Sequence, residues 1–115
     1  PERLSVLQEG DQWQLQLAIP PDLAHFTGHF PQTPVLPGVV QIDWAIGLAR
    51  ELIADLPPRF QGMEVLKFQQ LARPGDRLSL TLRFDRERSK LHFAYRNGEG
   101  DAPCSSGRIL LGDPL

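Results

Sequence analysis

The sequence predicts an α+β domain in which a curved antiparallel sheet of five or six strands wraps around one long buried helix. A proline-free segment at residues 38–55 carries apolar side chains around most of a helical wheel. Several other segments alternate apolar and polar residues, as half-buried strands do. The chain has 115 residues, a normal length for one domain, so residues 1–115 are expected to form a single unit.

The clearest strand is predicted at residues 12–19, where Trp13, Leu15 and Leu17 alternate with glutamines. The Glu-Gly-Asp turn before it favours pairing with a shorter strand at residues 4–7. Later strands, separated by turns rich in glycine, are predicted at residues 63–68, 78–84, 90–96 and 104–111.

The helix at residues 38–55 is predicted to stop before Pro57 and Pro58. At 1.5 Å per residue it would be about 27 Å long, enough to cross a domain of this size. A helix this apolar needs cover on most sides, which a sheet curved around it provides.

The composition argues against several classes of function. A formal net charge of −2 and a pI of about 5.9 do not suit a protein that binds nucleic acid by neutralising its phosphates. The longest apolar stretch, residues 35–49, is interrupted by Pro37 and Asp43, so no membrane span is expected. The single cysteine, Cys104, allows no internal disulfide and fits a reducing cytoplasm, which is the expected location. We expect Cys104 to be a small strand residue and not a nucleophile.

Two of the three histidines, His25 and His29, lie in a proline-rich segment, since five of the 11 prolines fall at residues 20–37. Histidines four residues apart suit a metal ion only in a helix, which the neighbouring glycine and prolines oppose, so no metal site is expected. The third histidine, His92, is expected to be solvated on its strand.

The proline-rich segment leads into a helix whose second turn carries Asp43, and histidine with a carboxylate is a common acid–base pair. A histidine titrates near neutral pH, and apolar surroundings raise the pKa of a carboxylate. Gly38 lies at the expected first turn, where unpaired N–H groups favour negative charge and can stabilise an oxyanion. A second interpretation stays open: Asp43 balances the helix dipole, and the histidines of the segment are merely solvated.

The segment GHFPQTPVLPGVVQID at residues 28–43 resembles the active-site segment of the 3-hydroxyacyl-[acyl-carrier-protein] dehydratase family. That family has a GHF element, then a proline, a PG pair and an acidic residue five positions after the glycine. Here Gly38 and Asp43 are five positions apart, and His29 and Asp43 are fourteen apart. Residues 67–68 (KF) and 73–78 (RPGDRL) resemble a second element of the family. The resemblance covers roughly residues 20–84 and is strongest to dehydratase-like proteins found with aryl-polyene or related lipid clusters.

This resemblance implies the hot-dog fold and a homodimer, or a higher oligomer, with the acyl tunnel between subunits. It implies that His29 is the catalytic base, that Asp43 is the acid contributed by the other subunit, and that the Gly38 N–H polarises the thioester carbonyl. The implied reaction removes water from a (3R)-3-hydroxyacyl thioester, bound to acyl carrier protein or to CoA, in fatty acid, aryl-polyene or related lipid biosynthesis. The product is a trans-2-enoyl thioester. No cofactor is expected beyond the phosphopantetheine of the substrate.

The resemblance also places Phe30, Pro37, Val39 and Trp44 at the substrate pocket. Trp44 fills a position that is often small in the family, and Gln32 stands where glycine is usual, so the pocket shape is expected to differ. Two other functions stay open. A hot-dog thioesterase would use a carboxylate to activate water and would not need His29, and a non-catalytic acyl-carrier-binding subunit would keep the fold without turnover.

Charge is unevenly divided between the two halves of the chain. Residues 1–57 contain two basic and seven acidic residues, a net −5, whereas residues 58–115 contain ten basic and seven acidic residues, a net +3. Basic residues of the second half are therefore candidates for docking an acidic carrier protein: Arg73 and Arg77 first, then Arg83, Arg86, Arg88 and Lys90. The alternative is that these arginines only cover the solvent face of the strands.

Overall fold

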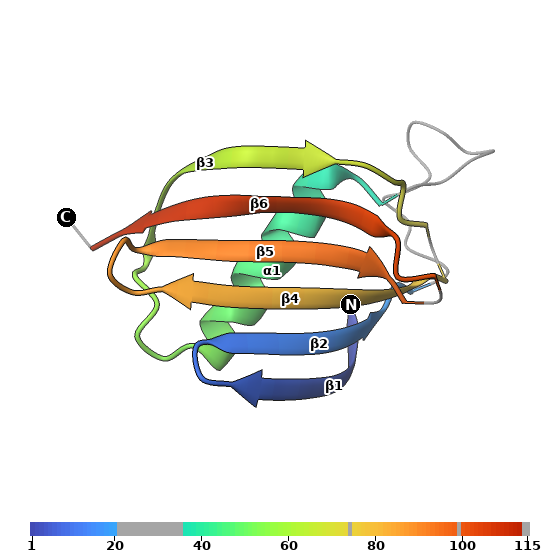
Figure 1. Cartoon of the computed structure of the whole chain (residues 1–115), viewed down its shortest axis with the longest axis horizontal. Helices are drawn as coiled ribbons and strands as arrows, with labels where there is room; N and C mark the ends of the chain where they lie inside the picture. Colours follow the sequence, from blue (N-terminus) through green and yellow to red (C-terminus); the bar gives the residue numbers. More distant parts are fainter. Residues whose placement is uncertain (21–35, 74, 99, 114–115) are drawn as a thin grey trace.

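A computed structural model describes residues 1–20, 36–73, 75–98 and 100–113 of the chain. Its elements are, in order, β1 (Glu2–Glu9), β2 (Gln12–Ala18), α1 (Gly38–Leu52), β3 (Arg59–Phe68), β4 (Arg77–Asp85), β5 (Lys90–Asn97) and β6 (Pro103–Gly112). The strands form one six-stranded antiparallel sheet in the order β1-β2-β4-β5-β6-β3. Figure 1 shows α1 lying across one face of this sheet. The predicted fold class, a hot-dog fold, is confirmed.

The core lies between α1 and the inner face of the sheet. Leu78, Leu80 and Leu82 of β4 are fully buried on that face and alternate with more exposed residues on the other face. The helix contributes Ala45 and Ala49, which allow its backbone to approach the sheet closely. The alternation read from the sequence therefore identified the buried face of β4 correctly.

Two elements differ in length from the prediction. The helix ends at Leu52 and not at residue 55, because Ile53 adopts an extended backbone (φ −114°, ψ 101°) while its side chain stays in the core. β3 begins at Arg59, four residues before the expected start, because its first residues already pair with the end of β6. Polar–apolar alternation does not reveal this pairing, since β3 is interrupted by irregular register at two places.

The expectation that α1 is buried nearly all round is wrong for the single chain. Its inner face packs on the sheet, but Val39 on the other side is 73% exposed, and Asp43, Gly47 and Arg50 are exposed with it. The sheet covers only one side of the helix. It ends at β3, which borders the open side, so no further strand covers that side.

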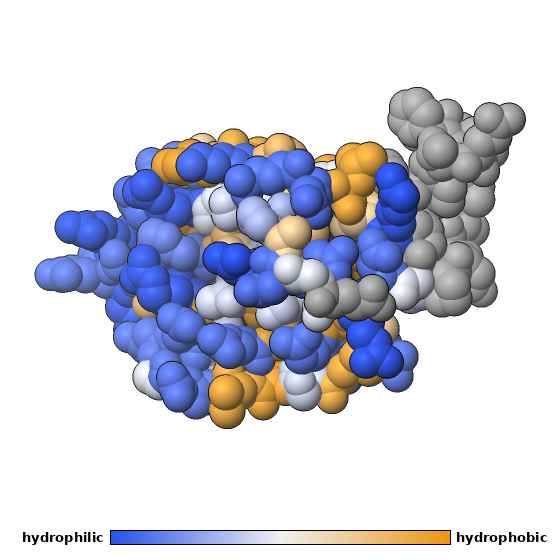
Figure 2. Space-filling model, turned by 45° about the vertical axis from the view of Figure 1, so that its right-hand side comes forward, coloured by the Kyte–Doolittle hydropathy of each residue, from blue (hydrophilic) through white to orange (hydrophobic). Residues whose placement is uncertain are grey.

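Apolar side chains gather at both edges of the sheet. On the outermost strand β3 the exposed apolar residues are Phe60, Met63, Val65, Leu66 and Phe68, and on β1 they are Leu4, Val6 and Leu7. Figure 2 shows these two apolar margins as orange bands along the upper and lower edges, with hydrophilic residues between them. Unpaired, apolar edge strands favour pairing with another chain.

Within the described ranges, no helix combines the length and the apolar character needed to cross a bilayer. Cys104 is buried on β6, and burial raises the pKa of its thiol. This confirms the prediction that Cys104 is a small strand residue, since a protonated, buried thiol is a poor nucleophile.

Candidate active site

The start of α1 places backbone N–H groups beside a small pocket, and among the described residues the N–H of Gly38 has no hydrogen-bond partner. The helix begins at Gly38 after Pro37, with no side-chain cap on its first turn and no acidic residue within that turn. The first N–H groups of an α-helix have no partner within the helix, so they carry a partial positive charge. Pro37 fixes the backbone just before these donors, as proline does well next to a helix start.

The pocket at this helix start has a volume of about 320 Å³. It is lined by Leu36, Pro37, Gly38, Gln41, Phe68, Gln69, Gln70 and Leu71. The ring of Phe68 lies directly against Gly38: a Cβ added at Gly38 would be 2.5 Å from Cζ of Phe68. Gly38 is therefore required for close approach of a ring, and the pocket combines an apolar wall with helix N–H donors.

Backbone hydrogen bonds hold the two walls of this pocket together. The N–H of Leu36 donates to the carbonyl of Ala72 at 2.6 Å, which ties the segment entering the helix to the segment after β3. The N–H of Gln69 donates to the carbonyl of Cys104 at 2.7 Å, so that second segment is itself fastened to β6. The pocket is therefore held by the sheet and does not depend on side chains alone.

A buried polar network fixes the first turn of α1 against the sheet. Gln41 is only 3% exposed, and its Nε2 donates to the carbonyl of Leu36 at 3.2 Å. The Ser105 hydroxyl donates to Gln41 Oε1 at 2.7 Å, and the Tyr95 hydroxyl donates to the Gln41 carbonyl at 2.6 Å. Burial raises the pKa of Tyr95 far above its ordinary value, so its hydroxyl stays a donor.

Asp43 lies in a different groove from Gly38. Residues five apart in an α-helix are rotated by about 140° and separated by about 7.5 Å along the axis. Accordingly, Asp43 is exposed on the open side of α1, in a groove of about 910 Å³ whose other residues include Val39, Phe60 and Met63. Within this chain, Gly38 and Asp43 thus line two different pockets.

The other expected pocket residues are separated in the same way. Pro37 lines the pocket at the helix start, whereas Val39 faces the groove with Asp43. Trp44 is half-buried and packs against the core between sheet and helix. His29 and Phe30 lie outside the described residues. In the part of the chain that the structure describes, no group of three or more His, Cys, Asp or Glu side chains could hold a metal ion.

Five of the six candidate docking residues fall into two groups, and the sixth, Arg83, contacts the ring of His92 on the outer face of the sheet. Arg86, Arg88 and Lys90 are engaged in ion pairs with carboxylates of this chain, which favours a structural role for them. Arg73 and Arg77 are exposed, and Arg73 lines a shallow hollow together with Gln70 and Leu71, which also line the pocket at Gly38. A cation thus borders the candidate pocket.

Three residues of the site were not identified from sequence: Gln41, Tyr95 and Ser105. The usable signal was Gln41, a polar residue on the apolar face of a predicted buried helix. A buried amide requires partners. The sequence does not show which strands supply them, because Ser105 is 64 positions away and meets Gln41 only through the fold.

Comparison with known proteins assigns the chain to a family. The ApeI-like family, described as ApeI dehydratase, matches residues 5–108. The chain is 30% identical to 3-hydroxyacyl-[acyl-carrier-protein] dehydratase FabZ of Oenococcus oeni over 118 residues, covering 96% of this chain and 85% of that protein.

Two solved structures are similar over nearly the whole chain. The dehydratase heterocomplex ApeI:P from Xenorhabdus doucetiae superposes with a TM-score of 0.85 at 35% identity, covering 96% of both chains. An uncharacterized protein from Erwinia carotovora subsp. atroseptica superposes with a TM-score of 0.82 at 36% identity, covering 98% of this chain and 94% of that one. The fold, the family match over residues 5–108 and the similarity to FabZ agree. The chain belongs to the ApeI-like dehydratase family, which is related to FabZ.

Proposed function

We propose that the protein dehydrates (3R)-3-hydroxyacyl thioesters to trans-2-enoyl thioesters, in fatty acid, aryl-polyene or related lipid biosynthesis. The observation that carries the proposal is the uncapped start of α1 at Gly38, which opens on an apolar pocket in a chain of a dehydratase family. An apolar wall suits an acyl chain, and helix N–H groups suit a carbonyl oxygen on which negative charge develops.

The chemistry requires a base, an acid and an oxyanion donor. His29 removes the proton from C2, and the electrons of that C–H bond move toward the thioester carbonyl. The Gly38 N–H stabilises the charge on the carbonyl oxygen. When the electrons return from the carbonyl oxygen toward C2, the C2–C3 double bond forms and the C3–O bond breaks. The hydroxyl leaves as water after it takes a proton from Asp43 or from the protonated His29. When the protonated His29 is the donor, all atoms of the substrate are found in the enoyl thioester and one water molecule. When Asp43 is the donor, His29 afterwards releases the C2 proton to solvent and Asp43 takes one proton from solvent, so the overall products are the same.

The separation of Gly38 and Asp43 supports a site shared by two chains. Within one chain they line different grooves, so Asp43 can act beside Gly38 only if it comes from a second chain. The groove with Asp43 is bordered by exposed apolar residues of β3, which such a chain would cover. We propose that a second copy of this protein supplies Asp43, in a homodimer.

The test is turnover of purified protein with 3-hydroxyacyl thioesters of several chain lengths, on carrier protein and on CoA, measured as loss of the mass of water. His29→Ala is expected to reduce turnover by a factor of about 100 or more, as removal of a general base does. His25→Ala removes a histidine from the same segment and serves as the matched control, with turnover retained. Dehydration by His29→Ala at the parental rate would refute the assignment.

A second candidate is a non-catalytic subunit of a two-chain dehydratase. The relative from Xenorhabdus doucetiae is a heterocomplex, ApeI:P, and the shared site proposed here needs a second chain from some source. In this case the purified protein alone would bind an acyl-carrier thioester without turnover, and activity would require a different hot-dog chain. Release of free acid without enoyl product would instead indicate a thioesterase.

A further inference from the structure

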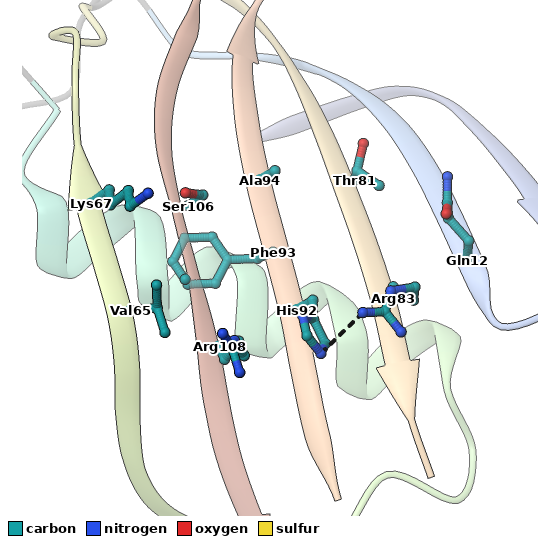
Figure 3. Close-up of a pocket in the computed structure, with 11 residues that line it drawn as sticks. Gln12, Val65, Lys67, Thr81, Arg83, His92, Phe93, Ala94, Ser106 and Arg108 are labelled. Atoms are coloured by element: carbon teal, nitrogen blue, oxygen red, sulfur yellow. Dashed lines mark hydrogen bonds between the residues drawn. The ribbon is translucent and has the colours of Figure 1, made fainter. Parts of the chain in front are cut away.

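The outer face of the sheet, opposite α1, carries a row of basic side chains. Strand register places Arg83 of β4 directly opposite His92 of β5, and His92 directly opposite Arg108 of β6. The row is extended at one end by Gln12 of β2 and at the other by Glu64 of β3. Figure 3 shows Arg83, His92 and Arg108 on neighbouring strands, with a hydrogen bond joining Arg83 to His92.

Such a row is unfavourable unless its charge is reduced or balanced, because like charges directly opposite one another repel. Burial lowers the pKa of His92, and the nearby Arg83, Arg108 and Lys90 lower it further, while Asp85 acts in the opposite direction. The neutral ring lies 3.2 Å from a guanidinium nitrogen of Arg83.

The carboxylates on this face are already paired with cations, and one of these cations, Arg108, belongs to the row. Glu64 accepts hydrogen bonds from Lys90 at 2.7 Å and from Arg108 at 3.2 Å, and its pKa is lowered chiefly by the bond to Lys90. Asp85 pairs with Arg88. Arg83 instead meets an imidazole nitrogen, which offers a lone pair but no negative charge. Positive charge therefore exceeds negative charge along the row.

An irregularity in β3 adds a further cation to the same face. Glu64 lies opposite Arg108 and Lys67 lies opposite Ser106, so three steps on β3 match two on β6. This extra residue is a β-bulge, without which Lys67 would point toward the helix side. Val65, within the bulge, has a φ of 54°, a left-handed conformation that is costly for a β-branched residue. The backbone thus holds a strained conformation that keeps Lys67 beside the row.

A groove lies between these cations and has a volume of about 290 Å³. Its floor is formed partly by the short side chains of Thr81, Ala94 and Ser106, which lie opposite one another on β4, β5 and β6. Longer basic side chains rise from the rim, at Arg83, Arg108 and Lys67 (Figure 3). Two floor residues carry hydroxyl donors, so the groove offers many donors around a hollow floor.

We propose that this groove binds the phosphate group of a small molecule. Guanidinium groups match phosphate oxygens in pairs, and the hydroxyls with the remaining N–H of the His92 ring complete the set of donors. The groove is on the opposite face of the sheet from α1 and shares no lining residue with the pocket at Gly38 or with the groove at Asp43. It is therefore a second site, and it does not depend on the proposed dehydratase activity.

The test is titration of the full chain with inorganic phosphate, with phosphopantetheine and with uncharged pantetheine, following the imidazole NMR signals of His92. Sodium chloride at equal ionic strength is the reference. A bound phosphate should saturate these signals and raise the pKa of His92, because an anion favours the charged ring. Tighter binding of phosphopantetheine than of phosphate would identify a carrier arm as the source, and equal binding would identify free phosphate.

Arg83→Gln should weaken binding of inorganic phosphate at least tenfold. Arg3→Gln, which removes one positive charge from the distant strand β1, should change it less than twofold. Equal weakening in both variants would mean that only the overall charge attracts the anion, and would overturn the proposal. A response of His92 to phosphate no larger than its response to chloride would also overturn it.

Discussion

Gln41 joins the start of α1 to the sheet through hydrogen bonds at both ends of its side-chain amide. Gln41→Leu keeps the approximate volume but leaves the Leu36 carbonyl and the Ser105 hydroxyl without this partner in a buried site. Leaving such groups unpaired costs about 1–3 kcal/mol, so we expect a loss of about 2 kcal/mol in the free energy of unfolding, measured by urea denaturation.

A double-mutant cycle isolates the network from simple repacking. Ser105→Ala alone should cost about 1 kcal/mol, and adding it to Gln41→Leu should cost less than it does alone, since the orphaned hydroxyl is then removed. If the two losses are strictly additive, the hydrogen bond between Ser105 and Gln41 contributes nothing. Because Gln41 also lines the pocket at Gly38, its loss is expected to affect turnover as well.

The close contact with the Phe68 ring explains why residue 38 is glycine, and this explanation can be tested by substitution. Alanine is favoured over glycine within helices by up to about 1 kcal/mol, but here the added Cβ would overlap the Phe68 ring. Phe68 is 53% exposed, so its ring can move at moderate cost. We expect Gly38→Ala to be neutral or destabilising in the parent and stabilising in a Phe68→Ala background, as measured by chemical denaturation. The same effect in both backgrounds would refute this explanation.

At the scale of elements, Arg86 connects three turns that are distant in sequence. Its guanidinium donates two hydrogen bonds to Asp55 after α1, at 2.7 and 3.0 Å, and one to Asp11 between β1 and β2. The Phe84 ring lies 5.2 Å from the guanidinium carbon. The connection after the helix is thereby fastened to both hairpin turns at that end of the sheet.

This contact predicts a particular response to acid. The hydrogen bond from Arg86 lowers the pKa of Asp55 below its ordinary value of 3.8. A carboxyl group whose pKa is lower in the folded state contributes stability above its unfolded pKa and loses it as the pH falls through the folded value. Asp55→Asn should therefore lower the melting temperature at pH 7 only slightly, because the pair is exposed. The difference from the parent should shrink as the pH falls below 3.8 and through the lower pKa of folded Asp55.

The matched control is Glu87→Gln, which removes an exposed carboxylate from the same turn as Arg86. It should leave the melting temperature at pH 7 close to that of the parent. High salt should reduce the effect of Asp55→Asn, since exposed ion pairs are screened. A difference between Asp55→Asn and the parent that stays constant from pH 7 to pH 2 would contradict the assignment.

The regular strands could be predicted from sequence nearly in full, whereas only residues 63–68 of the irregular strand β3 were predicted. In β4 every second residue from Leu78 to Phe84 is buried, so the alternation alone identifies both the strand and its inner face. β3 contains two breaks in register, one of which turns both Glu64 and Lys67 to the outer face. A two-residue period cannot represent an extra residue, so the sequence did not show that Lys67 lies on the same face as Arg83 and Arg108.

For the whole molecule, the sequence placed Gly38 and Asp43 correctly on one helix, but the helix rotation between them separates the two grooves. This separation is compatible with the expectation from the family resemblance that Asp43 is contributed by the other subunit, and the roles of both residues stay predictions. In the proposed homodimer the two residues meet across the chains, and the second chain would lie on the open side of α1, beside its apolar neighbour β3. The proposed dimer would also explain why the helix is so apolar on a side that the sheet does not cover.

Both edges of the sheet expose apolar residues, but the proposed dimer would bury only the edge formed by β3. Phe60 on β3 is 47% exposed and borders the groove with Asp43, whereas Leu7 on β1 is 59% exposed at the other edge, far along the sheet. Phe60→Glu would bury a carboxylate without a partner between two chains, so sedimentation should show a monomer, and turnover should fall with it. Leu7→Glu places the same charge at the other edge and should leave a dimer with parental turnover. If Leu7→Glu alone dissociates the dimer, the chains associate through β1 and the site shared across β3 is refuted.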